Sequence, residues 1–89
     1  GECICTLKGH SHIVFKVELF SDQKRAISCS IDATLIVWDV TSGNPIHILK
    51  GHTECVFHVS LFLDQKRALS CSDDATLKIW DVESGECIQ

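Results

Sequence analysis

One stretch of sequence occurs twice in this 89-residue chain, and it limits the possible folds more than any other feature. Residues 28–40 read SCSIDATLIVWDV and residues 70–82 read SCSDDATLKIWDV, so the repeat length is 42 residues. About 27 of the 42 aligned positions are identical. The chain therefore divides into a first repeat, a second repeat and the start of a third, at residues 1–42, 43–84 and 85–89.

Each repeat contains segments rich in β-branched, aromatic and other apolar residues, separated by turns that contain Gly, Ser, Asp or Asn. The strands predicted in the first repeat are residues 3–8, 13–20, 25–30 and 35–40. No segment has a sustained helical period, and several lack strict alternation, as expected when both faces of a sheet are covered. Four-stranded antiparallel sheets that stack at a period of about 40 to 45 residues form β-propellers. The sequence therefore predicts an all-β fold with two propeller blades per chain.

The residues that recur at fixed places resemble the signature of the WD-repeat family of β-propellers. Gly9-His10 is followed by Trp38-Asp39, with the His and Trp 28 positions apart, and the second repeat has the same spacing. The resemblance covers the whole chain. In that family a His, a Ser, an Asp and a Trp form a hydrogen-bonded tetrad inside each blade. The matching positions are His10, Ser28, Asp32 and Trp38 in the first repeat, and His52, Ser70, Asp74 and Trp80 in the second.

The resemblance also implies that the sequence repeat is out of step with the blade. Residues 3–8 would be the outer strand of one blade, and the next three strands would belong to the following blade. Residues 45–50 would then complete the outer edge of the first blade.

A Ser-His-Asp catalytic triad is the alternative interpretation of the tetrads, because all three residue types are present. We reject it because the set occurs in both repeats, a Trp closes it, and no loop suited to an oxyanion hole is evident. Buried Trp, Ser and His groups each need a hydrogen-bond partner, which is a sufficient reason for the pattern. We expect a protein that is not an enzyme and that has no cofactor.

A binding rim is the second feature that the resemblance implies. In WD-repeat proteins, three positions in each repeat line the mouth of the central channel and contact partners. They correspond here to Ile13, Phe15 and Ile31, and to Cys55, Phe57 and Asp73. The recurring Phe15 and Phe57 would form a circle of aromatic rings suited to peptides or other proteins. Alternatively, both rings pack between the blades, and the sequence does not decide between these possibilities.

The charge distribution argues against two classes of partner. The net charge is −4, and the longest basic runs are Lys24-Arg25 and Lys66-Arg67, so nucleic acid is not an expected partner. We interpret the turns that contain these pairs as solvated. No apolar run approaches the 18 residues of a membrane span, and no secretory signal is evident near the start, so we expect no membrane association.

The six cysteines do not follow a disulfide pattern, because partners are missing from one repeat to the next. We interpret them as reduced residues of a cytoplasmic protein. A metal site at Cys3, Cys5 and His47 was considered, but core packing is favoured because no Cys-x-x-Cys or His-x-x-x-His spacing occurs. His12 and His58 are likewise interpreted as surface or packing residues.

Two blades leave two apolar faces and open sheet edges in water. Either the sequence is an excerpt of a longer array, or several copies close a ring by cyclic symmetry. Three copies would give six blades and four would give eight, and we prefer the tetramer because eight blades is a known propeller size. Residues 3–8 would complete the last blade of a neighbouring copy. Two function hypotheses follow: a protein-interaction scaffold, or a purely structural amplified or engineered repeat.

Overall fold

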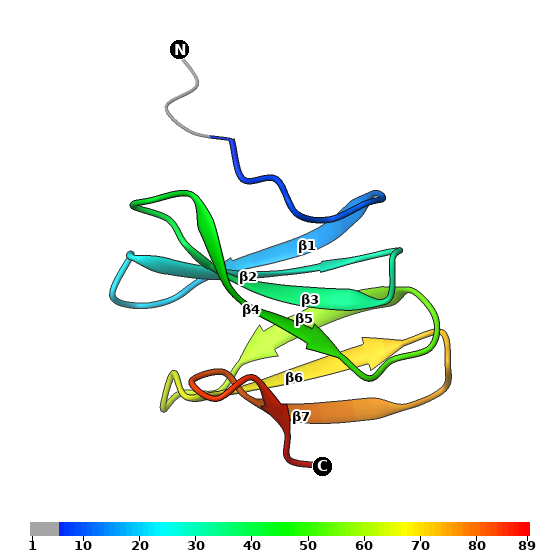
Figure 1. Cartoon of the computed structure of the whole chain (residues 1–89). Coiled ribbons are helices and arrows are strands. Elements are labelled where there is room, and N and C mark those ends of the chain that lie inside the picture. The colour runs from blue at the N-terminus through cyan, green and yellow to red at the C-terminus, as the bar shows by residue number, and fades with distance from the viewer. Residues whose placement is uncertain (1–5) are drawn as a thin grey trace.

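The computed structural model describes residues 6–89, which form eight β-strands in two sheets (Figure 1). The strands are β1 (Val14–Leu19), β2 (Arg25–Ser30), β3 (Thr34–Asp39), β4 (Asn44–Lys50), β5 (Val56–Leu61), β6 (Arg67–Ser72), β7 (Leu77–Asp81) and β8 (Glu86–Cys87). Both sheets are antiparallel, with the strand orders β1-β2-β3-β4 (blade 1) and β5-β6-β7-β8 (blade 2). The predicted all-β fold with two four-stranded blades is confirmed. Among the described residues there is no helix, and thus no helix that could span a membrane. The two sheets that these residues form do not close into a ring.

The outer strand of blade 1 comes from the second sequence repeat. β4 pairs with β3 from Thr34↔Lys50 to Asp39↔Asn44, which confirms that residues 45–50 complete the first blade. The predicted strand at residues 3–8 has a different outcome. Residues 3–5 lie outside the described residues, and residues 6–8 are not in a strand. A strand there would pair with the third strand of a preceding blade, and the two blades that the described residues form both follow residue 8.

The hydrophobic core lies between the two blades, which stack face on face (Figure 1). The buried residues that form it are Phe20, Ile27, Cys29, Leu35, Val37 and Leu49 from blade 1, and Val56, Val59, Ala68, Trp80 and Val82 from blade 2. β2 and β3 are almost continuously buried because blade 2 covers one face and residues 6–12 reach over part of the other, as the contacts of Gly9 with Ile36 and Trp38 illustrate. This burial on both faces explains why these strands lack strict alternation.

Candidate functional site

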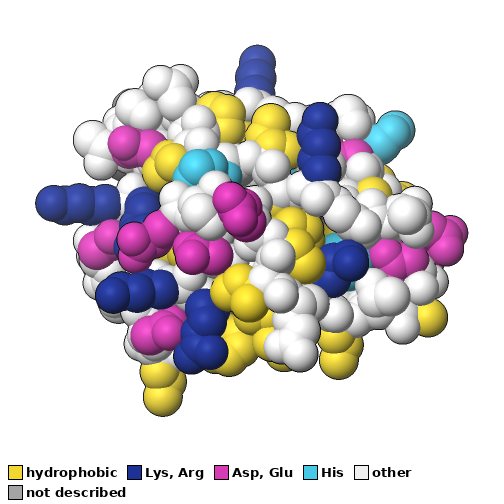
Figure 2. Space-filling view, turned by 60° about the horizontal axis from the view of Figure 1, so that its bottom comes forward, with side chains coloured by type: hydrophobic (Ala, Val, Ile, Leu, Met, Phe, Trp, Pro, Cys, Tyr) yellow, Lys and Arg dark blue, Asp and Glu magenta, His cyan; other side chains and the backbone are white. Residues whose placement is uncertain are grey.

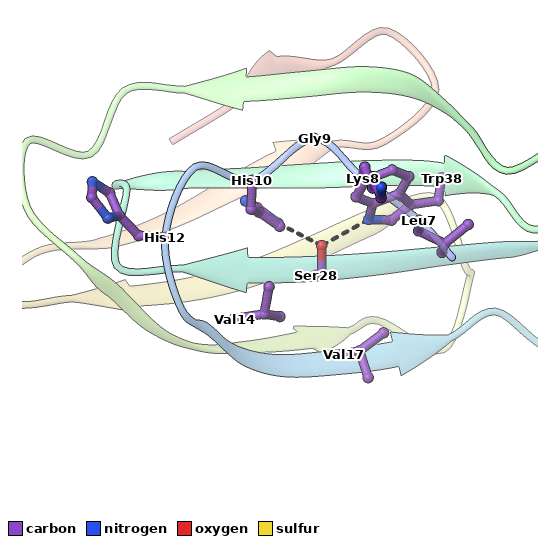
Figure 3. A pocket seen from close by; sticks show the side chains of 9 residues that line it. All are labelled: Leu7, Lys8, Gly9, His10, His12, Val14, Val17, Ser28 and Trp38. Carbon is purple, nitrogen blue, oxygen red and sulfur yellow. Dashed lines mark hydrogen bonds between the residues drawn. The ribbon is translucent and has the colours of Figure 1, made fainter. Parts of the chain in front are cut away.

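The four tetrad residues of blade 1 lie in one hydrogen-bonded network. Figure 3 shows part of it, the bonds of His10 and Trp38 to Ser28. Trp38 Nε1 donates to Ser28 Oγ over 2.8 Å, and Ser28 Oγ lies 2.7 Å from His10 Nε2. On the other side of the imidazole ring, Nδ1 lies 3.1 Å from Asp32 Oδ2. We assign the proton of a neutral imidazole to Nδ1, because the aspartate only accepts and the serine hydroxyl can then donate to Nε2.

Blade 2 contains the same network with nearly the same dimensions. Trp80 Nε1 donates to Ser70 Oγ over 2.8 Å, and Ser70 Oγ lies 2.7 Å from His52 Nε2. The distance from His52 Nδ1 to Asp74 Oδ2 is 2.9 Å. The structure thus brings together all eight predicted tetrad residues, in two sets of four.

The geometry of the tetrad does not suit nucleophilic catalysis. Ser28 and Ser70 are both buried, and each hydroxyl accepts from a tryptophan while it faces a histidine. An attacking serine needs a free approach to a substrate carbonyl and nearby oxyanion donors. The network instead connects the loop before β1 to β2, the following turn and β3, so it acts as a clasp within the blade.

Two threonines that the sequence analysis did not assign belong to the clasp. The Thr34 hydroxyl donates to Asp32 Oδ1 and lies 3.2 Å from His10 Nδ1. Thr76 makes the equivalent contacts to Asp74 and His52. The available signal was the exact recurrence of the Asp-Ala-Thr turn in both repeats.

The hydrogen bonds of the turn change the acidity of its aspartates. Burial raises the pKa of Asp32, but the hydroxyl and backbone N–H of Thr34, the backbone N–H of Ser11 and the ring of His10 outweigh this and lower it to about 2. The Thr76 hydroxyl is the largest influence on Asp74, and with the other donors it lowers the pKa of that carboxyl well below its usual range. Both carboxylates therefore stay ionised over the physiological range.

Each Gly-His pair contributes its glycine to the clasp as well. A Cβ at Gly9 would lie 2.9 Å from Cη2 of Trp38, and one at Gly51 would lie 3.1 Å from Cη2 of Trp80. The tryptophan ring therefore packs directly on the glycine backbone. The sequence signature is explained by this close approach, because a side chain at either glycine would displace the ring.

The six residues predicted for the rim lie at or just before the start of β1 and β5 and just after the end of β2 and β6. The pairing of β1 with β2 shifts register between Val14 and Lys16, which leaves Phe15 at a β-bulge, and the same shift in blade 2 leaves Phe57 at the equivalent place. The two rings contact each other across the blades, with centroids 5.6 Å apart, and they remain 44% and 45% exposed. The structure therefore combines the two alternatives: the rings pack against each other and still face solvent.

The other four rim residues lie beside the phenylalanines in two pairs. The backbone N–H of Ile31 donates to the carbonyl of Ile13, and that of Asp73 donates to the carbonyl of Cys55. Ile13 and Ile31 are both exposed, so the first pair extends the apolar surface. In the second pair the Cys55 thiol donates to the Asp73 carboxylate over 3.5 Å. The two blades thus present one apolar and one acidic edge to the same rim.

The turns at the opposite end of the blades are ordered by their charged residues. Asp22 accepts from Nε of Arg25 at 3.0 Å, and the guanidinium carbon of Arg25 lies 4.3 Å from the ring centroid of Phe20. Asp64, Arg67 and Phe62 repeat this arrangement. These groups already satisfy one another, which agrees with a structural rather than a binding role for the turns.

The histidines outside the tetrads contact neighbouring groups or solvent. His47 Nε2 donates to the carbonyl of Glu83 over 2.7 Å, so it joins the two blades. Lys16 Nζ donates to His58 Nε2 over 3.1 Å, and His12 is exposed. Within residues 6–89, no three His, Cys, Asp or Glu side chains are grouped to hold a metal. Cys3 and Cys5, the other members of the metal site that we considered, lie outside that range.

Comparisons with known proteins agree with this architecture. The family described as WD domain, G-beta repeat (WD40) matches residues 1–39 and 43–81. An uncharacterized WD repeat-containing protein of Schizosaccharomyces pombe is 48% identical over 42 residues, which are 47% of this chain and 11% of that protein. The small ribosomal subunit protein RACK1 of Saccharomyces cerevisiae is 46% identical over 43 residues, which are 48% of this chain and 14% of that protein. The similarity thus spans only a small part of each relative. On the match in both repeats, the chain belongs to the WD40 repeat family, whose members are generally non-catalytic scaffolds.

Proposed function

We propose that this chain is a non-enzymatic protein-interaction scaffold that binds peptides or other proteins at its rim. The observation that carries the proposal is the exposed pair of Phe15 and Phe57, set at two β-bulges and flanked by Ile13 and Ile31. Bulges often redirect side chains beside binding sites, and exposed aromatic clusters are typical of interfaces. The acidic edge at Asp73 would favour ligands that combine an apolar side chain with a basic one.

We further propose that copies of the chain assemble into a closed propeller, with eight blades from four chains preferred over six from three. The support is that each end of the two-blade stack exposes apolar side chains that the middle of the stack buries. If the chain is instead part of a longer polypeptide with more repeats, other blades of that polypeptide would cover these faces. The described cysteines carry free thiols, which fits the reducing, cytoplasmic location that we propose.

Selection from a phage-displayed library of random peptides tests the binding function. We expect peptides enriched on the wild-type chain to lose binding to a Phe15→Ala/Phe57→Ala variant. The matched control is Ile46→Ala/Ile48→Ala, because these isoleucines are exposed to a similar extent, at 45% and 48%, but lie on β4 at the outer edge of blade 1. Peptides that bind the phenylalanine variant as well as the wild type would refute the rim as the site.

A purely structural repeat is the second candidate function. It is favoured by the identity of residues 22–26 with residues 64–68, which extends to exposed turn positions such as Lys24 and Lys66. If no peptide is enriched while the chain still assembles, this candidate replaces the first.

A further inference from the structure

Blade 2 packs against blade 1 through apolar residues of β5, and the equivalent residues of blade 1 are exposed. In blade 2, Val56 and Val59 on β5 are fully buried and Leu61 is partly buried. Their equivalents on β1 are Val14, Val17 and Leu19, which are 48%, 60% and 54% exposed. We call these three residues the front face. The chemistry of the two sets is identical, so only the presence of a neighbouring blade distinguishes them.

The back of blade 2 shows the converse. Blade 1 buries Ile27, Leu35 and Val37 completely against blade 2. The equivalent residues of blade 2 are Leu69, Leu77 and Ile79, and we call them the back face. Leu69 and Leu77 are 37% and 66% exposed, and Ile79 is partly exposed. Figure 2 turns the lower side of the molecule in Figure 1 toward the viewer, and hydrophobic side chains are visible there among charged ones.

A hollow of about 390 Å³ lies over the front face (Figure 3). Val14, Val17, Ser28 and Trp38 form part of its lining. The equivalent residues of blade 2, which are Val56, Val59, Ser70 and Trp80, are all buried. Blade 2 therefore has no hollow at the equivalent position. Its residues Val56, Val59 and Trp80 lie there in the same buried core as Leu35 and Val37 of blade 1. The back face carries the equivalents of those two residues.

We propose that the occupant of the front face is the back face of a second copy of this chain, in the geometry that blade 1 and blade 2 have within one chain. The inference rests on the proposed self-assembly and deepens it, because it names the two surfaces and their polarity. The contact joins different surfaces, so each copy keeps one free face until a ring closes. This polarity differs from that of a two-fold dimer in which one face meets the same face of the other copy.

The polar and aromatic contacts across the two blades can be repeated between copies. Within the chain, Gln65 Oε1 accepts from the backbone N–H of Ser21 over 2.7 Å. Gln23 is the equivalent of Gln65, so its side chain would accept from the backbone N–H of Leu63 in the adjacent copy. Phe57 of one copy would meet Phe15 of the next, as the two rings meet within the chain. No contact of a new chemical type is required.

Two single variants test the polarity when they are studied alone and mixed. Val17→Arg blocks the front face and Leu77→Arg blocks the back face, and both positions are mostly exposed in the single chain, so folding tolerates the change. By light scattering we expect each variant alone to be monomeric, and an equal mixture to contain 1:1 dimers with twice the monomer mass. Leu19→Arg and Leu69→Arg are second choices if circular dichroism shows that either first variant is unfolded.

The control is Ile46→Arg. Ile46 is 45% exposed, and its equivalent in blade 2, Ile88, is 54% exposed. It should assemble like the wild type. A monomeric wild-type chain would refute self-assembly altogether. A wild-type oligomer that survives both face variants would leave self-assembly intact but refute the proposed surfaces. Face variants that form homodimers, or that never combine when mixed, would refute the head-to-tail polarity. None of these results depends on peptide binding at the rim.

Discussion

The two blades have almost the same sequence, but they differ in which face is covered. Val59 is fully buried and its equivalent Val17 is 60% exposed, while Leu35 is fully buried and its equivalent Leu77 is 66% exposed. The strands that carry these residues are paired in the same registers in both blades. Burial of an apolar position in a repeat protein is therefore a property of the interface with the neighbouring repeat.

The hydrogen-bonded clasps, in contrast to the apolar faces, are alike in the two blades. The hydrogen bonds from Trp38 and from Trp80 to their serines have the same length, although the surroundings of the two blades differ. The partners of each clasp come from one blade and the loop that precedes it. The geometry of a network closed within one blade is therefore nearly the same in both blades, whereas the burial of the apolar faces differs between them.

The largest difference between the blades should come from leucine truncation. We expect Leu35→Ala to lower the free energy of unfolding by about 2 to 5 kcal/mol, because it leaves a cavity between the blades. Leu77→Ala should change it by less than about 0.5 kcal/mol, since the side chain is mostly in solvent. Both should be measured by urea denaturation in a chain that also carries Val17→Arg, which blocks assembly through the front face. Equal losses would contradict the assigned asymmetry.

The clasps should respond equally to loss of their serines. Ser28→Ala and Ser70→Ala each leave a tryptophan N–H without its acceptor and a histidine nitrogen without its donor. We expect each to cost about 1 to 3 kcal/mol in the same denaturation experiment. A much smaller cost in blade 1 than in blade 2 would show that the clasp, too, depends on the neighbouring blade.

Acid should weaken both clasps over a defined range. The pKa of Asp32 is lowered from 3.8 to about 2 in the folded chain, so its ionised form stabilises the fold above pH 4. This contribution is lost as the pH falls from about 4 toward 2, because the unfolded chain takes up the proton first. We expect the melting temperature of the wild type to fall over this range more steeply than that of Asp32→Asn. Parallel curves would contradict the assigned hydrogen bonds.

The smallest effect should come from the turn residue between Asp32 and Thr34. Ala33 has φ 72° and Ala75 has φ 70°, a left-handed conformation that disfavours residues with a Cβ. Glycine relieves this strain but adds freedom to the unfolded chain, so we expect Ala33→Gly and Ala75→Gly to stabilise by less than about 1 kcal/mol each. Thermal melts should register a small rise in both cases. A loss of stability would mean that the turn is not strained.

The repeat and most of the strands could be predicted from the residues alone. The reason is that turns and apolar segments are local signals, and the 42-residue recurrence set the bounds of each repeat. The His, Ser, Asp and Trp of each clasp required the family resemblance as well, and the two threonines were not predicted. The offset between repeat and blade was also predictable, although it required the family resemblance. The residues could not show whether 3–8 form an outer strand, since such a strand forms only by pairing with the edge strand of another blade.

Three other features depend on strand pairing and on packing between segments that are distant in sequence. The bulges that turn Phe15 and Phe57 toward the rim arise from strand pairing, because the sequence of β1 does not indicate which residue stays unpaired with β2. The contact of Gly9 with Trp38 joins residues that are distant in sequence and so depends on packing. The exposure of Val17 and Leu77 depends on where the stack of blades ends. The same residue type is buried in one blade and exposed in the other, because burial is set by the next blade in the stack.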